Sequence, residues 1–305
     1  MEFLSKNKYT LYGVAAILLW SCLVALLRDI SELFSPIGGA AAMYSVSAIF
    51  LILVMGVPKF SGFSKRYLVV GTLLFVSYEI CLALSIGMAN SRHQAMEMAV
   101  INYLWPTLTI LLSIIGRKKV SYWVYPSMII AFLGVAWCIT GDQEMSLDTL
   151  VTNFADNPAT YLMALTAAFI WAIYCVVTQK LSNGKNAITL FFTVTAMSLW
   201  AQYAFSNEAP LTFSLSSSIT LLLAGVVIGS GYALWNQAII GGNLMLLGTL
   251  SYFTPVFSTI ISALYLSITL SASFWQGVVL VTVGSLICYF VTREKPKQPQ
   301  IASAT

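Results

Sequence analysis

The chain has 305 residues, of which 59% are hydrophobic and only 9% are charged, and its net charge is +4. Soluble domains carry roughly a quarter charged residues, so a chain this apolar cannot present a polar surface to water on every side. The composition excludes a soluble domain of any size, and it predicts a membrane protein built from transmembrane helices of roughly 20 residues each.

Long apolar runs predict ten transmembrane helices. In chain order we expect them at 9–27, 37–57, 67–89, 94–115, 122–140, 159–180, 187–205, 218–240, 243–266 and 272–291. The first run resembles a signal peptide because Lys6 and Lys8 precede it. It has no small-residue cleavage site, so we expect a retained helix.

The basic residues predict the orientation. Thirteen of the fifteen Lys and Arg residues fall on the side that holds both termini, and only Arg28 and Arg92 fall on the other. Because cytoplasmic loops carry an excess of Lys and Arg, we expect both termini in the cytoplasm and an even number of helices. The positive net charge is then a topological signal, and it gives no indication of nucleic-acid binding.

An internal repeat relates segment 102–113 to segment 251–262. The matches in register are Tyr103 with Tyr252, Pro106 with Pro255 and Ser113 with Ser262. Trp20 with Trp171 and Gly134 with Gly284 repeat at nearly the same offset. A unit of five helices is odd in number, so the second copy must enter the membrane from the opposite side. This predicts an inverted-topology repeat, with the substrate site near the midplane where the halves meet.

The expected fold class is therefore all-α integral membrane, with ten transmembrane helices in two inverted five-helix repeats and both termini cytoplasmic. The first repeat spans 1–140 and the second spans 159–292. Between them, residues 141–158 form an external acidic loop, and residues 293–305 form a cytoplasmic tail.

Glu79 lies near the centre of the third predicted helix. A carboxylate at that depth costs at least a few kcal/mol unless it is solvated, paired or protonated. We expect Glu79 to face a wet cavity or a polar partner. It either contacts a substrate ammonium group, couples transport to protons, or forms a structural hydrogen bond to a neighbouring helix.

His93 and Glu97 lie four residues apart at the outer end of the fourth predicted helix, so they can face each other. The pair suits a gate or a proton relay, and a local pair at a solvated helix start explains it equally well. Pro106 and Pro255 fall inside predicted helices, where each removes a backbone hydrogen bond and should kink its helix. Such kinks either mark the repeat interface or serve packing alone.

Several aromatic residues lie too deep in the predicted helices to belong to an interfacial belt. Core packing explains any one of them, but as a group they favour a cavity that binds flat or cationic solutes by stacking and cation–π contact. The candidate substrate-binding residues are Trp20, Tyr78, Glu79, Asn102, Tyr103, Trp105, Trp171, Trp235 and Tyr252.

Motifs for other chemistries are absent from the sequence. The five cysteines all fall in apolar runs, the single histidine has no metal-ligand neighbours, and there is no Gly-rich phosphate loop. We therefore expect no metal, no cofactor and no catalytic residue. The expected partners are a small-molecule substrate and the lipid bilayer, and the sequence leaves the oligomeric state open.

Four segments resemble a known family: Phe75–Ser85, His93–Glu97, Asn102–Pro106 and Ser251–Pro255. They are similar to the bacterial aromatic amino acid exporters of the drug/metabolite transporter superfamily of EamA-like proteins, and the similarity covers nearly the whole chain. The resemblance implies an inner-membrane exporter of phenylalanine, tyrosine and tryptophan. It also implies a central cavity that opens alternately to each side, lined by Trp20, Tyr78, Glu79, Tyr103, Trp105 and Trp171.

Other functions remain as alternatives. The same aromatic cavity would suit an exporter of other amphipathic metabolites or cationic drugs. A channel is a further alternative. An integral-membrane enzyme, with Glu79 or His93 as general base, is disfavoured because an enzyme does not need two inverted halves. Since no nucleotide-binding motif is present, the energy for transport must come from ion or solute gradients.

Overall fold

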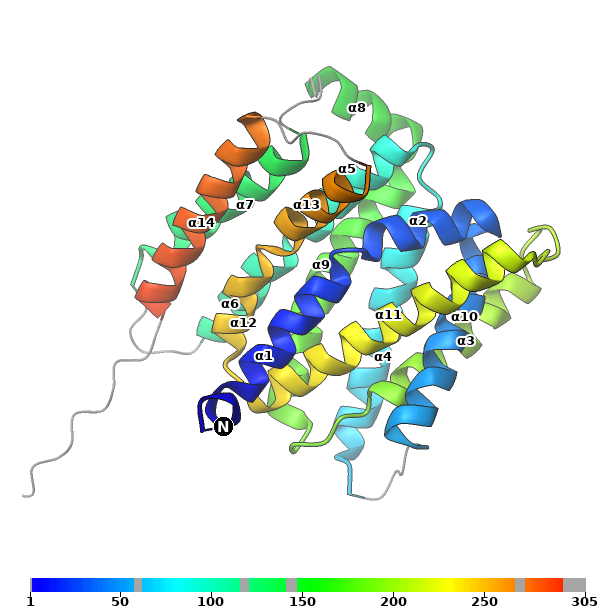
Figure 1. Ribbon diagram of the computed structural model, residues 1–305, viewed down its shortest axis with the longest axis horizontal. Coiled ribbons are helices and arrows are strands. Elements are labelled where there is room, and N and C mark those ends of the chain that lie inside the picture. Colours follow the sequence, from blue (N-terminus) through cyan, green and yellow to red (C-terminus); the bar gives the residue numbers. More distant parts are fainter. Residues whose placement is uncertain (1, 58–61, 116–120, 141–146, 267–271, 293–305) are drawn as a thin grey trace, which may run out of the picture.

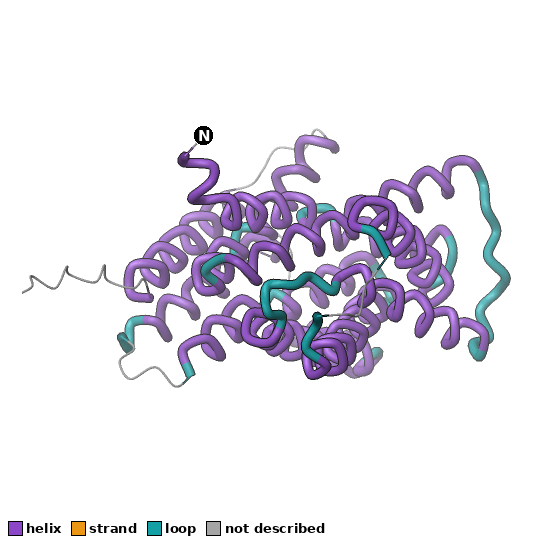
Figure 2. Tube along the Cα trace, turned by 90° about the horizontal axis from the view of Figure 1, so that it is seen from below, coloured by secondary structure: helices purple, strands orange, loops and turns teal. Residues whose placement is uncertain are grey.

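The computed structural model describes residues 2–57, 62–115, 121–140, 147–266 and 272–292. Within these ranges the chain forms fourteen α-helices and no strand (Figures 1 and 2). The helices are α1 Glu2–Trp20, α2 Leu23–Leu33, α3 Pro36–Met55, α4 Lys65–Gly87, α5 Arg92–Asn102, α6 Trp105–Ile114, α7 Val124–Thr140, α8 Leu147–Asp156, α9 Pro158–Leu181, α10 Ile188–Ala204, α11 Leu215–Gly241, α12 Leu244–Ser251, α13 Thr254–Leu266 and α14 Ala272–Thr292.

Seven helical spans among the described residues are long and apolar enough to cross a membrane. Three shorter apolar helices, at Val124–Trp137, Ile188–Ala204 and Leu244–Ser258, coincide with the other three predicted transmembrane helices. The prediction of an all-helical membrane protein is confirmed, and the count of ten stays a prediction. The segment expected as an external loop contains one helix, α8.

Three of the predicted transmembrane helices are interrupted. The breaks lie between α1 and α2, between α5 and α6, and between α12 and α13. At the last two, a proline occupies the second position of the new helix, as Pro106 in α6 and Pro255 in α13. Because proline has no N–H and a fixed φ, it cannot continue the preceding helix but suits the first turn of the next one.

The two proline-associated breaks share an equivalent backbone hydrogen bond. The amide of Leu104 donates to the carbonyl of Ile101 at 3.1 Å, and the amide of Phe253 donates to the carbonyl of Leu250 at 3.0 Å. Such bonds between residues three apart tighten the final turn of a helix. The chain thus ends and restarts a helix in the same way at repeat-related positions.

The helices pack in cross-half pairs. In Figure 1, α7 lies beside α14 at one edge and α1 runs beside α11. Similar contacts join α4 to α9 and α3 to α10. Every one of these pairs joins a helix from the first predicted half to a helix from the second, so the halves are packed into one bundle.

Glycines allow α7 and α14 to approach with their backbones almost in contact. A Cβ atom on Gly134 would lie 2.5 Å from the backbone nitrogen of Val281, and one on Gly284 would lie 2.5 Å from the backbone nitrogen of Ala131. No side chain fits at either position without separating the helices. This close approach is typical of membrane helices, which lack a hydrophobic driving force and associate through packing.

Gly134→Leu is therefore expected to destabilise the protein. Overpacking of a well-packed site costs about 1 to 3 kcal/mol, and here the obstacle is backbone, which cannot move aside as a side chain can. Thermal unfolding in detergent should show a lowered midpoint. The matched control is Leu133→Ile, because Leu133 is the preceding residue and its side chain is 55% exposed. Equal midpoints for the two variants would contradict the packing described here.

Candidate functional site

Four aromatic rings surround Trp20 at the end of α1. The centroid of the Trp20 ring lies 4.9 Å from that of Tyr232 and 5.0 Å from that of Trp235, both on α11. Trp171 of α9 and Trp105 of α6 meet it edge to face, at 5.8 Å and 6.4 Å. Edge-to-face and tilted pairs at these distances are favourable beyond the area they bury. The cluster therefore joins helices of both predicted halves.

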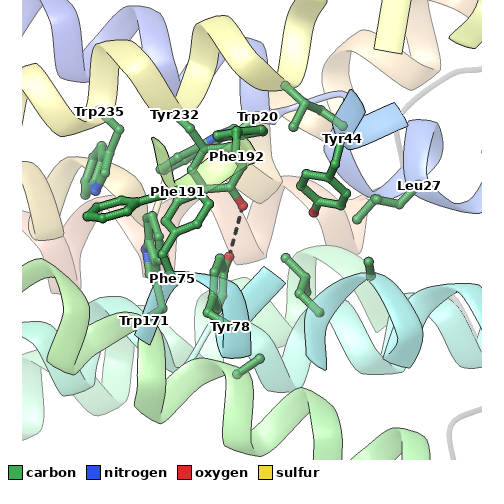
Figure 3. Packing of buried hydrophobic residues seen from close by; sticks show 14 of the residues in the cluster. Trp20, Leu27, Tyr44, Phe75, Tyr78, Trp171, Phe191, Phe192, Tyr232 and Trp235 are labelled. Atoms are coloured by element: carbon green, nitrogen blue, oxygen red, sulfur yellow. Dashed lines mark hydrogen bonds between the residues drawn. The ribbon is translucent and has the colours of Figure 1, made fainter. Parts of the chain in front are cut away.

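Tyr78 of α4 extends the cluster. Its ring stacks on that of Trp171 with centroids 4.4 Å apart and an interplanar angle of 28°. Figure 3 shows the hydrogen bond in which the Tyr232 hydroxyl donates to the Tyr78 hydroxyl, at 3.3 Å. Phe75, one turn before Tyr78, packs against Trp171 and Tyr232. The result is a continuous block of buried rings in the middle of the bundle.

The rings of this block almost fill the space between them. A cavity of about 30 Å³ remains. Pockets for small ligands commonly reach about 300 Å³ or more. Of the predicted substrate-binding residues, those that line the cavity are Trp20, Tyr78, Asn102, Tyr103, Trp105 and Trp171. A solute as large as an amino acid can enter only if these rings separate.

All three helix breaks meet at this cavity. Trp20 is the last residue of α1, Asn102 is the last residue of α5, and Trp105 and Thr254 are the first residues of α6 and α13. The hydroxyl of Ser21 donates to the carbonyl of Thr254 at 3.4 Å, which links the first break to the third. Discontinuous helices whose ends line a midplane cavity are typical of secondary transporters, where the helix termini bind charged groups.

Glu79 is not among the residues that line the cavity, although its neighbour Tyr78 is. The carboxylate is fully buried and accepts a hydrogen bond at Oε2 from the Tyr44 hydroxyl of α3. Figure 3 places Tyr44 apart from the tryptophans, towards Leu27. Among the described residues, Oε1 of Glu79 has no hydrogen-bond partner. The structure thus gives Glu79 the polar partner on a neighbouring helix that its depth requires.

Two other predicted site residues do not line the cavity. Trp235 packs behind it, with its ring 5.4 Å from that of Trp105. Tyr252 lies in a second buried cluster, where its hydroxyl is 2.5 Å from the hydroxyl of Thr107. Tyr103 belongs to that second cluster and also reaches the cavity wall. The repeat-related tyrosines 103 and 252 therefore have different surroundings.

Glu97 lies on α5 and binds α8 and α9. Its carboxylate accepts hydrogen bonds from the Asn153 amide, at 2.9 Å, and from the Tyr161 hydroxyl. The side chain of His93 lies outside the described residues, so the predicted pairing with Glu97 stays a prediction. These bonds hold the start of α5 against the corner between α8 and α9.

An ion-pair network covers the same end of the bundle. Arg92 binds Glu32 at 2.5 Å and Asp29 at 3.0 Å, and Arg28 binds Glu32 at 2.7 Å. Arg28 also donates to the backbone carbonyl of Ala89 at 2.7 Å. Exposed ion pairs contribute little to stability, but together these bonds connect α2 to the segment between α4 and α5. This connection cannot be predicted from the sequence, because it joins residues 60 positions apart.

A larger cavity, of about 510 Å³, opens at the other end of α1. Its walls come from α1, α6, α9, the end of α11 and the start of α12, and they include Tyr9, Gln179, Lys180, Gly242 and Asn243. The Gln179 amide donates to the Gly242 carbonyl at 3.2 Å. The bundle is thus hollowed at the end that holds the N-terminus and bridged by ion pairs at the opposite end.

Apolar helices long enough to cross a membrane, packed around a buried aromatic cluster where broken helices meet, define a multi-pass membrane protein. Comparison with known proteins identifies its family and its fold. Residues 158–290 match the EamA-like transporter family. The fold resembles that of a solved crystal structure with a TM-score of 0.76 and 21% sequence identity, over 95% of this chain and 99% of that one.

Three curated relatives are similar over most of their length. The aromatic amino acid exporter YddG of Salmonella typhimurium is 46% identical over 96% of this chain and 100% of its own. The exporter of the same name from Escherichia coli is 45% identical over 95% of this chain and 99% of its own. That of Ancylobacter novellus is 24% identical over 85% of this chain and 88% of its own. The chain therefore belongs to the EamA-like transporter family, and within it to the group of these relatives.

Proposed function

We propose that this protein exports phenylalanine, tyrosine and tryptophan across the bacterial inner membrane as a secondary transporter. The relatives that are 45 and 46% identical over nearly their whole length are named aromatic amino acid exporters. The observation that carries the proposal is the ring cluster around Trp20, since stacking surfaces from four helices converge on one buried point. An aromatic side chain that enters between these rings replaces ring–ring contacts with contacts of the same kind.

The transporter is built from two inverted five-helix repeats, with ten transmembrane helices and both termini in the cytoplasm. The symmetry of the contacts supports this. If the halves are exchanged, the contact of α4 with α9 becomes that of α11 with α1, and both contacts are present. The exchange maps the contact of α7 with α14 onto the same contact, and it does the same for the contact of α3 with α10. A two-fold axis requires such reciprocal contacts.

Transport proceeds by alternating access. The 510 Å³ cavity at the N-terminal end of α1 supports an access route from the cytoplasm, and the ion pairs of Arg92 with Asp29 and Glu32 support a closed outer side. Glu97, bound to Asn153 and Tyr161, belongs to the outer closure as well. The breaks before Pro106 and Pro255 are the places where helix segments can change their angle without losing further hydrogen bonds.

Counterflow in proteoliposomes tests the function. Purified protein should exchange labelled phenylalanine and tryptophan in a saturable manner. The exchange of leucine should be at least about tenfold slower, because leucine forms no ring stack. An excess of a flat dication should not compete. If the dication competed better than tryptophan, the protein would be an exporter of cationic compounds instead. Flux that rose linearly with substrate concentration would indicate a channel.

A further inference from the structure

Three residues that line the central cavity each carry a polar side-chain atom with no hydrogen-bond partner within the described residues. The atoms are Nε1 of Trp20, Oδ1 of Asn102 and Oγ1 of Thr254. The three residues are at least nine-tenths buried, with exposed fractions of 7%, 7% and 3%. Buried polar atoms are ordinarily paired, so these three atoms are available to a ligand that enters when the rings separate.

The three atoms differ in what they can bind. An indole N–H only donates, a hydroxyl can donate, and an amide oxygen only accepts. An α-amino acid carries one carboxylate, which accepts, and one ammonium group, which donates. Two donors and one acceptor around a cavity therefore match the polar end of an amino acid, whatever its side chain.

Two of the helix ends at the cavity, the start of α13 and the end of α5, add the same polarity. Thr254 begins α13, so the positive end of that helix dipole lies at its hydroxyl. Asn102 ends α5, so the negative end of that dipole lies at its amide oxygen. The N-terminus of a helix favours an anion, and the C-terminus favours a cation. The two breaks before Pro106 and Pro255 thus create a positive and a negative helix end on one cavity.

We propose that Thr254 and the N-terminus of α13 bind the α-carboxylate of the substrate, with the indole N–H of Trp20 as second donor. Asn102 and the C-terminus of α5 bind the α-ammonium group. This inference rests on the proposed function, and it adds the orientation of the amino acid. The carboxylate points towards Thr254, the ammonium group points towards Asn102, and the side chain enters between the rings of Trp105 and Trp171.

Thr254→Val tests the carboxylate assignment, because valine keeps the shape of threonine and removes the hydroxyl. The measurement is the competition of unlabelled phenylalanine and of phenylalaninamide against labelled phenylalanine in counterflow. The amide keeps the ring and the ammonium group but has no carboxylate. The wild-type protein should prefer phenylalanine, and Thr254→Val should reduce this preference on the order of tenfold, as expected for a hydrogen bond to a charged group. Thr254→Ser should restore it.

Thr109→Val is the matched control. The Thr109 hydroxyl is also buried and without a partner in the described part of the chain, but it does not line the cavity. This variant should keep the wild-type preference. Because the readout is a ratio of two competitors on one preparation, it does not depend on folding yield.

Two results would overturn the assignment. One is a wild-type protein that does not distinguish phenylalanine from its amide. The other is a Thr254→Val variant that keeps the wild-type preference. In both cases phenylalanine is still exchanged, so the proposed function stands. Wild-type protein that does not exchange phenylalanine at all would overturn the function and the assignment together.

Discussion

Trp171→Ala is expected to abolish the preference for tryptophan over leucine and to destabilise the protein. Trp171 is 1% exposed and contacts rings on four other helices, with Tyr78 stacked on it at 4.4 Å. Truncation of a buried tryptophan costs about 3 to 5 kcal/mol of stability. Each lost ring contact removes on the order of 1 kcal/mol from the binding of an aromatic side chain, and leucine loses no ring stacking.

Trp171→Phe separates the two effects, because it keeps an aromatic surface and most of the volume. We expect it to fold with nearly normal yield and to retain a reduced preference for tryptophan. Trp275→Ala is the control for loss of a tryptophan, since Trp275 is 53% exposed on α14. Competition of tryptophan and leucine in counterflow gives the preference for each variant. If Trp171→Ala weakened both substrates equally, the ring would be a scaffold and would not determine specificity.

Glu79→Leu is expected to lower the yield of folded protein, whereas Glu79→Gln is expected to bind phenylalanine within about twofold of wild type. The carboxylate accepts a hydrogen bond from the Tyr44 hydroxyl in the middle of the bundle. Leucine leaves that hydroxyl buried and unpaired, which costs about 1 to 3 kcal/mol, and it adds a branched side chain to a filled space. Glutamine retains an acceptor for Tyr44. Glu79 does not line the cavity, so the loss of its charge removes no direct substrate contact.

Detergent-solubilised yield and counterflow affinity measure the two parts of this prediction. Tyr44→Phe is the matched partner variant, and it should partly rescue the yield of Glu79→Leu because both polar groups are then absent. A different role would be evident if Glu79→Gln lost affinity for phenylalanine but not for N-acetylphenylalanine, which has no ammonium group. Glu79 would then bind the substrate ammonium. Normal exchange with no response of net transport to a pH gradient would assign proton coupling to Glu79.

The sequence by itself determined the class of protein and the positions of two of its helix breaks. Nine per cent charged residues and repeated apolar runs leave no alternative to a helical membrane protein. The register of Pro106 with Pro255 indicated where two helices are interrupted, because proline removes a hydrogen bond wherever it stands. The residue types also indicated a cluster of deep aromatic rings, since Trp20, Trp105 and Trp171 lie too deep for an interfacial belt, and these three rings meet in the structure.

Only the tertiary structure decided which deep residues meet. Trp20 and Tyr252 are both buried aromatics near a helix break, yet one is at the centre of the ring cluster and the other binds Thr107. Glu79 and Tyr78 are adjacent, yet only Tyr78 lines the cavity. Thr254 has no distinguishing sequence feature apart from its repeat position opposite Trp105. The physical reason is that lipid and protein interior are equally apolar, so a transmembrane helix has no polar face to indicate its orientation. The rotation of each helix follows from packing, and packing exists only in the folded bundle.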